Sequence, residues 1–136
     1  MGRTKPNSRG MLPGGRKAGG GTFTRVPHAL QRHPDYIALT LGARAFLVDL
    51  MSQYNGRNNG NLAAAEGVMG KLGYSKRQCI RYREELKERG WIEVTRTPRW
   101  PREPYLFRLT WIDVGDWTGE PVLDEGVRLR PRRSLQ

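Results

Sequence analysis

The sequence predicts a single α+β domain that is mostly helical, with three to four helices, a two- or three-stranded β-hairpin and disordered basic tails. Between residues 41 and 89, apolar side chains recur every three or four positions, which is typical of amphipathic helices. After Gly90 the pattern changes to two runs of β-forming residues separated by a proline-rich loop. The 136 residues leave room for one domain of ordinary size.

Composition divides the chain into three parts. Residues 1–21 are rich in Gly, Pro, Arg and Lys and offer little to bury, so we expect a disordered basic arm. Residues 22–117 contain the helical and strand patterns and form the expected domain. Residues 118–136 carry four arginines and are expected to be a disordered tail with a basic end.

The net charge of +11 is unevenly distributed. Residues 1–25 carry +6, residues 71–108 carry +6 and residues 126–136 carry +4, whereas residues 109–125 carry −5. Such segregation is typical of a face that binds a polyanion, here with two basic tails. The alternative is solvated charge that serves solubility alone.

The first predicted elements are a short helical turn and a longer helix. Pro34 starts the turn, with His33 or Asp35 as its capping group. Thr40 is a good N-cap for a helix from Leu41 to about Tyr54. The side chains expected on its buried stripe are Ala43, Phe46, Leu47, Leu50, Met51 and Tyr54.

The middle of the chain is expected to form a very short strand and two helices with a glycine turn between them. The strand covers residues 61–62, and a helix of small residues covers 63–72. Gly73 ends this helix, because glycine adopts the left-handed conformation without a steric penalty. Ser75 then caps a helix over residues 76–89.

A β-hairpin follows Gly90, which ends the preceding helix. Residues 91–96 and 105–111 are its expected strands. The connection, called here the wing (residues 96–104), contains three prolines that cannot continue either strand.

The stretch from Leu62 to Trp111 resembles winged helix-turn-helix domains. The run Gly73-Tyr74-Ser75-Lys76-Arg77-Gln78, followed by Leu86-Lys87-Glu88-Arg89-Gly90-Trp91-Ile92-Glu93, is similar to a pattern found in many bacterial regulators of that class. The span from Phe23 to Trp111 also resembles short helix-turn-helix proteins of phages, prophages and plasmids. The resemblance implies that helix 76–89 reads a DNA major groove. The wing here has no glycine, so whether it enters a minor groove stays open.

Helix 76–89 offers residues suited to reading bases. Cys79, Tyr82 and Leu86 share one face and are expected to pack inward. Arg and Gln make bidentate contacts to guanine and adenine edges, and free amides near a capping serine suit a phosphate. The DNA contacts expected here are Tyr74, Ser75, Lys76, Arg77, Gln78 and Arg81. The alternative is a solvated helix in which Arg81 pairs with Glu85.

In the wing, Arg96, Arg99 and Arg102 are expected to hold phosphates and set the register of the helix in the groove. Trp100 is expected either to contact DNA or to pack against the base of the hairpin.

The residue inventory argues against an enzyme, and we expect no catalytic residues, no metal and no cofactor. One cysteine and two histidines cannot build a zinc site of ordinary spacing. The lone Cys79 rules out an internal disulfide and fits a reducing compartment, so the cytoplasm is the expected location. No stretch approaches the roughly 18 to 20 apolar residues that span a bilayer, so no membrane contact is expected.

The leading hypothesis is therefore a duplex DNA-binding protein, a transcriptional regulator of a phage, prophage or plasmid. A replication-origin-binding protein is the alternative within the same class. A third reading is an adaptor or inhibitor that binds a host protein instead of DNA. The target sequence, the sign of regulation and a homodimeric state stay open.

Overall fold

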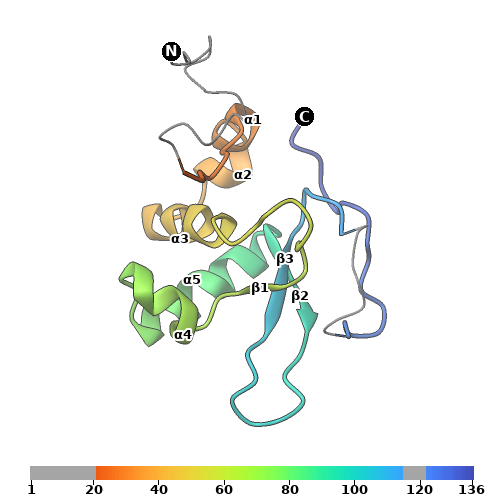
Figure 1. Cartoon of the computed structure of the whole chain (residues 1–136). Helices are drawn as coiled ribbons and strands as arrows, with labels where there is room; N and C mark the ends of the chain where they lie inside the picture. Colours follow the sequence, from red (N-terminus) through yellow and green to blue (C-terminus); the bar gives the residue numbers. More distant parts are fainter. Residues whose placement is uncertain (1–20, 115–121) are drawn as a thin grey trace, which may run out of the picture.

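The computed structural model describes residues 21–114 and 122–136, so the arm expected at 1–21 lies, apart from Gly21, outside the described residues. Within them, five α-helices, one 3₁₀ helix and a three-stranded antiparallel sheet form a small α+β domain (Figure 1). This layout is consistent with a winged-helix-like arrangement without being specific to it.

Two one-turn helices begin the domain. The helix α1 (His28–Gln31) was not expected from the sequence, and it raises the number of described helices above the predicted three to four. The second, α2 (Pro34–Ile37), begins as predicted, because Nδ1 of His33 accepts a hydrogen bond from the backbone N–H of Asp35 at 3.1 Å.

The helix α3 (Leu41–Met51) carries much of the core. Thr40 caps it as predicted, since its Oγ1 accepts a hydrogen bond from the backbone N–H of Ala43 at 3.3 Å. The helix ends at Met51 rather than near Tyr54, because residues 52–54 continue in tighter turns whose amides bond three residues back. Its buried residues are Ala43, Phe46, Leu47, Leu50 and Met51.

The helix predicted over residues 63–72 is shorter and divided. Ala63 belongs to strand β1 (Leu62–Ala63), and the helical turn α4 (Glu66–Met69) runs into the 3₁₀ helix η1 (Gly70–Leu72). Because this segment is short, only Met69 of α4 is fully buried, while Val68 and Leu72 are exposed.

The helix α5 (Lys76–Glu88) has the N-terminal cap and flanking turns that the sequence predicts. Oγ of Ser75 accepts a hydrogen bond from the backbone N–H of Gln78 at 3.1 Å, and Oε1 of Gln78 accepts one from the backbone N–H of Ser75 at 2.9 Å. This reciprocal capping box satisfies two amide groups at the helix start. Gly73 and Gly90 adopt the predicted left-handed conformation, with φ of 101° and 77°.

The sheet has the order β1-β3-β2, with all pairs antiparallel. Strands β2 (Ile92–Arg96) and β3 (Leu106–Leu109) form the predicted hairpin, and the wing connects them. The register shifts between Val94 and Arg96, so the last pair before the wing is irregular. Every residue of β3 is buried, because this strand lies in the centre of the sheet.

The C-terminal segment (residues 122–136) differs from the prediction of a disordered tail, of which residues 118–121 lie outside the described part of the chain. It runs beside the sheet (Figure 1). The side chain of Arg108 on β3 holds it there. The fully buried guanidinium of Arg108 donates hydrogen bonds to the backbone carbonyls of Arg128 and Arg130. A guanidinium has five donors, so one buried side chain satisfies carbonyls of a segment without regular secondary structure.

Two arginines of the predicted basic end are held by the domain. Arg132 forms an ion pair with Glu93 of β2 at 2.8 Å. Arg133 forms one with Asp35 of α2 at 3.3 Å, and its guanidinium carbon lies 3.8 Å from the ring centre of Trp91. These two side chains are therefore engaged with the folded domain.

Candidate nucleic-acid interface

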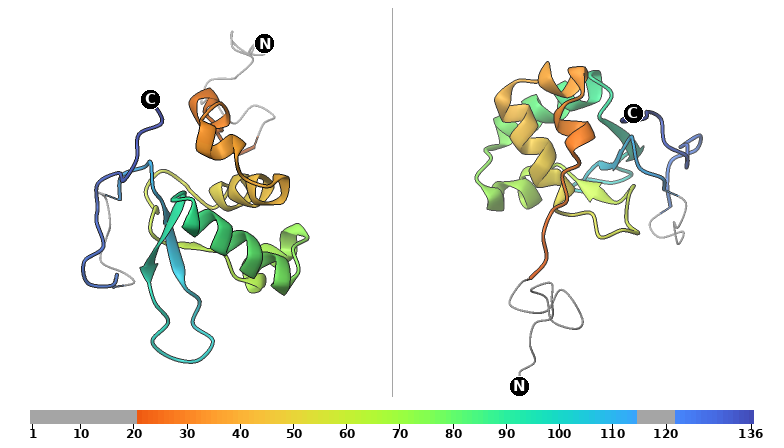
Figure 2. Two further views of the ribbon diagram at one scale, coloured as in Figure 1. Left: turned by 180° about the vertical axis from the view of Figure 1, so that it is seen from behind. Right: turned by 90° about the horizontal axis from the view of Figure 1, so that it is seen from above.

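Four neighbouring side chains form the outer face of α5: Lys76, Arg77, Ile80 and Arg81. All four are exposed, and together they line an open hollow of ≈ 500 Å³. Seen from behind (Figure 2, left), α5 lies unobstructed in front of the other helices, and the wing extends beyond the body of the domain. The helix and the wing are thus both accessible to a large partner.

The opposite face of α5 is fixed to α3. Cys79 and Leu86 are buried as predicted, and Tyr82 is half-buried. The ring of Tyr82 packs at 5.9 Å from that of Phe46 on α3. A hydrogen-bonded contact adds to this packing, because the Glu85 carboxylate accepts from the backbone N–H and the hydroxyl of Thr40, each at 2.8 Å.

Two of the three acidic residues of α5, Glu84 and Glu85, are engaged away from its outer face. Glu85 binds Thr40, so the alternative pairing of Arg81 with Glu85 is not formed. Glu84 forms ion pairs with Arg83 at 3.1 Å and with Lys87 at 3.3 Å. Burial alone would raise the pKa of Glu84, but hydrogen bonds from these two cations outweigh it and lower the pKa below its ordinary value.

As a result, the cations of the outer face have no carboxylate partner within the residues that the structure describes. Lys76 and Arg77 are exposed at the start of the helix, and Arg81 lies one turn further along with its guanidinium 5.6 Å from the Tyr82 ring. Three uncompensated cations within two turns of an exposed helix concentrate positive charge on this face.

Tyr74 has a different place from the one predicted. Its hydroxyl donates a 2.6 Å hydrogen bond to Asp49 of α3, and its ring lies edge-on to Phe46 at a centre-to-centre distance of 4.9 Å. Burial, followed by the bond to Asp49, raises the pKa of Tyr74 well above its ordinary value. The Tyr74 side chain packs against the core instead of projecting into solvent, because its ring buries more apolar surface against Phe46 than it would in solvent.

Ser75 and Gln78 are also partly engaged. Their side-chain oxygens bind each other's backbone amides in the capping box. The amides of Lys76 and Arg77 take no part in that motif, so they are the helix-start donors nearest to the outer face. The sequence correctly placed Ser75 and Gln78 at the helix start, but Gln78 Oε1 already has a donor.

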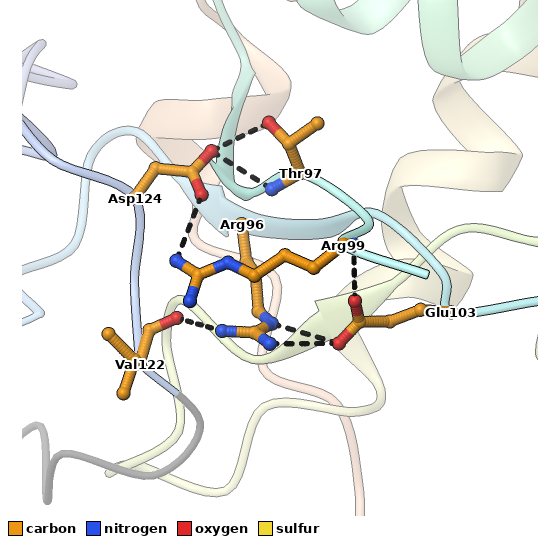
Figure 3. Close-up of polar contacts among 6 residues, drawn as sticks. All are labelled: Arg96, Thr97, Arg99, Glu103, Val122 and Asp124. Atoms are coloured by element: carbon orange, nitrogen blue, oxygen red, sulfur yellow. Dashed lines mark hydrogen bonds and ion pairs between the residues drawn. The ribbon is translucent and has the colours of Figure 1, made fainter. Parts of the chain in front are cut away.

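In the wing, Arg96 was predicted to hold a phosphate, but its side chain points into the protein. Its guanidinium donates to Glu103 at 2.9 Å and 3.1 Å and to the backbone carbonyl of Val122, and the residue is buried (Figure 3). Glu103 also accepts from the backbone N–H of Arg99 at 2.6 Å. Arg96 therefore stabilises the shape of the wing from within, because β2 directs this side chain toward the C-terminal segment.

The remaining predicted wing residues are exposed. Trp100 is 62% exposed, and the Arg96 guanidinium at the end of β2 lies 6.0 Å from its ring centre. Arg102 is exposed and is the one non-glycine residue with positive φ among those described, at 72°. Arg99 is exposed and faces Asp124 of the C-terminal segment across 3.7 Å (Figure 3).

Sequence reasoning missed Ile80 on the outer face of α5 and the contact between Thr97 and Asp124 beside the wing. The helical spacing contained the signal for Ile80, since a residue one position after the inward Cys79 lies off the buried face. Thr97 and Asp124 are hydrogen-bonded across 27 positions of the sequence. No local pattern indicates such a contact.

Other kinds of site find little support in the described residues. No group of three or more His, Cys, Asp or Glu side chains in that part of the chain is arranged to hold a metal ion. Burial raises the pKa of Cys79, which disfavours the reactive thiolate form. Among residues 21–114 and 122–136, no helix combines the length and the apolar composition needed to cross a membrane.

Comparison with known proteins identifies no relative, since no family model, curated protein or solved structure matches the chain.

Proposed function

We propose that this protein is a winged helix-turn-helix protein that binds duplex DNA, with α5 as the helix that enters the major groove. The observation that carries the proposal is the outer face of α5, where three exposed cations lack carboxylate partners while Glu84 and Glu85 of the same helix bind elsewhere. If these cations served solubility alone, pairing along the helix would be expected.

In this proposal, Arg77 and Arg81 read base edges, because a guanidinium makes a bidentate contact with guanine. Lys76 and the free amides at the helix start bind a phosphate. The resemblance in sequence favours a transcriptional regulator of a phage, prophage or plasmid, and an origin-binding protein would use the same contacts.

The wing supplies phosphate contacts from Arg99 and Arg102, whereas Arg96 stabilises its conformation. The left-handed backbone of Arg102 supports a role for its side chain, because glycine would fit this conformation at lower cost. The exposed Trp100 is available to the same partner.

The proposal is tested in two steps. Bound sequences are first selected from a random duplex library. The selected site and a random duplex are then titrated with the protein at several salt concentrations. Arg81→Ala should cost about 1–3 kcal/mol on the selected site and much less on random DNA. Lys87→Ala removes the same charge from the same helix, but at a residue already paired with Glu84, and should change little.

Equal losses on selected and random DNA would show that Arg81 contacts phosphate and not a base. Absence of salt-dependent duplex binding in the full chain would overturn the proposal and favour the protein-binding adaptor.

A further inference from the structure

Three hydrogen-bond donors of the wing converge on one carboxylate from a distant part of the chain (Figure 3). The backbone N–H and the hydroxyl of Thr97 donate to Oδ2 of Asp124 at 2.9 Å and 2.6 Å. Nη2 of Arg99 lies 3.7 Å from the other carboxylate oxygen. A backbone amide, a hydroxyl and a guanidinium are the groups with which proteins bind phosphate oxygens. The wing therefore has an anion site, which Asp124 occupies in the free protein.

This outer cluster differs from the inner pair formed by Arg96 and Glu103. The inner side chains are 6% and 16% exposed and lie 2.9 Å apart, whereas those of Arg99 and Asp124 are 42% and 30% exposed. A long and exposed ion pair contributes little to stability. The inner pair can thus maintain the wing while the outer carboxylate exchanges for another anion.

We propose that Asp124 competes with a DNA phosphate, and that duplex binding displaces its carboxylate from Thr97 and Arg99. The phosphate then accepts from the same three donors, so no donor is left unsatisfied. This inference rests on the proposed duplex binding. It adds Thr97 to the interface and makes Asp124 an autoinhibitory residue.

The displacement does not require the C-terminal segment to leave. The backbone N–H of Asp124 donates to the carbonyl of Thr95 at 2.8 Å, and the Val122 carbonyl accepts from Arg96. These backbone contacts remain when the Asp124 side chain rotates away.

Asp124→Asn tests the inference in the full chain, with the selected duplex as ligand. The substitution removes the competing charge and should tighten binding about 3- to 10-fold. The slope of log affinity against log salt should become steeper by up to about 0.9, the contribution of one phosphate contact. Asp124→Glu, which restores a carboxylate, should return the affinity toward that of the wild type.

Glu125→Gln is the matched control, because it makes the same charge change at the adjacent, exposed position. It should give a much smaller gain than Asp124→Asn. In the Asp124→Asn background, Arg99→Ala should abolish the gain, since the freed donor is then lost. Thermal melts of all variants establish that folded proteins are compared.

Equal gains from Asp124→Asn and Glu125→Gln would overturn the inference, because the effect would then be one of net charge. A gain that survives Arg99→Ala would also overturn it. If the wild type binds the duplex and Asp124→Asn binds no better, the inference fails while the proposed function stands. If no variant binds duplex DNA, both fail.

Discussion

Gly42 of α3 lies directly against the ring of Tyr82 on α5, so closely that a Cβ at this position would overlap the tyrosine hydroxyl and ring. The two helices approach each other here because glycine has no side chain. This contact, with the Thr40–Glu85 hydrogen bonds nearby, fixes α5 so that its outer face stays exposed.

Gly42→Ala should therefore destabilise the protein by about 1–3 kcal/mol, the usual cost of overpacking, although alanine favours helix formation. Gly67→Ala on α4 is the control, because nothing lies within 4 Å of a Cβ built there. Urea unfolding followed by tryptophan fluorescence measures both. If both variants were more stable than the wild type, the close approach of α3 and α5 would be wrong.

Ile80 should read the methyl group of thymine. It is a large apolar side chain, 44% exposed, among the three cations of the outer face, and apolar contact with the thymine methyl is a known mode of base readout. Replacing the contacted thymine by deoxyuridine should weaken wild-type binding about 4-fold, the effect of one buried methyl group.

The Ile80→Ala variant should be insensitive to that replacement. Ile37→Ala removes an isoleucine from α2 that is 53% exposed, and this variant should keep the full sensitivity to the methyl group. Scanning every thymine of the selected site by anisotropy titration checks the prediction. If Ile80→Ala remained as sensitive to the methyl group as Ile37→Ala, Ile80 would not contact a thymine.

Arg133 should anchor the C-terminal segment to the core. Its guanidinium stacks on Trp91 at 3.8 Å and donates to the carbonyl of Arg89 at 2.8 Å. Arg133→Ala should lower the free energy of unfolding by about 1–3 kcal/mol through loss of the cation–π contact and the hydrogen bond. Arg130→Ala, at an exposed side chain, should change it by less than about 0.5 kcal/mol. Equal effects in denaturant titrations would argue against this anchor.

Acidification should loosen the wing through Glu103. The hydrogen bond from the Arg99 amide, and then the contacts with Arg96, hold the pKa of Glu103 below its ordinary value of 4.5. A carboxyl group with a lowered pKa in the folded state stabilises above the ordinary pKa, and this stabilisation is lost as the pH falls through the folded-state value.

The unfolding free energy of the wild type should thus decline below about pH 4.5, and Glu103→Gln should reduce that decline. Some decline should persist in the variant, because the pKa of Glu84 is lowered too. Chemical denaturation across a pH series checks this. An identical pH dependence in both proteins would mean that Glu103 has no such role.

The sequence alone determined the elements whose signals are local. Thr40, Ser75, Gly73 and Gly90 set helix ends through contacts within a few residues, so capping rules located them correctly. The alternation of apolar residues likewise indicated the hairpin, and the helical period indicated the buried face of α5. These features depend on backbone conformation and on spacing, which a sequence displays directly.

Tertiary structure alone decided which charged residues remain available to a ligand. Arg96 and Arg99 are three positions apart and have the same type of side chain. Arg96 is buried against Glu103 and Val122, whereas Arg99 is exposed and faces the half-buried carboxylate of Asp124. The difference depends on where the C-terminal segment lies, and the buried donors of Arg108, with the contacts of Arg132 and Arg133, hold that segment in place. Such contacts join residues far apart in the chain, and their strength depends on burial, which no local pattern encodes.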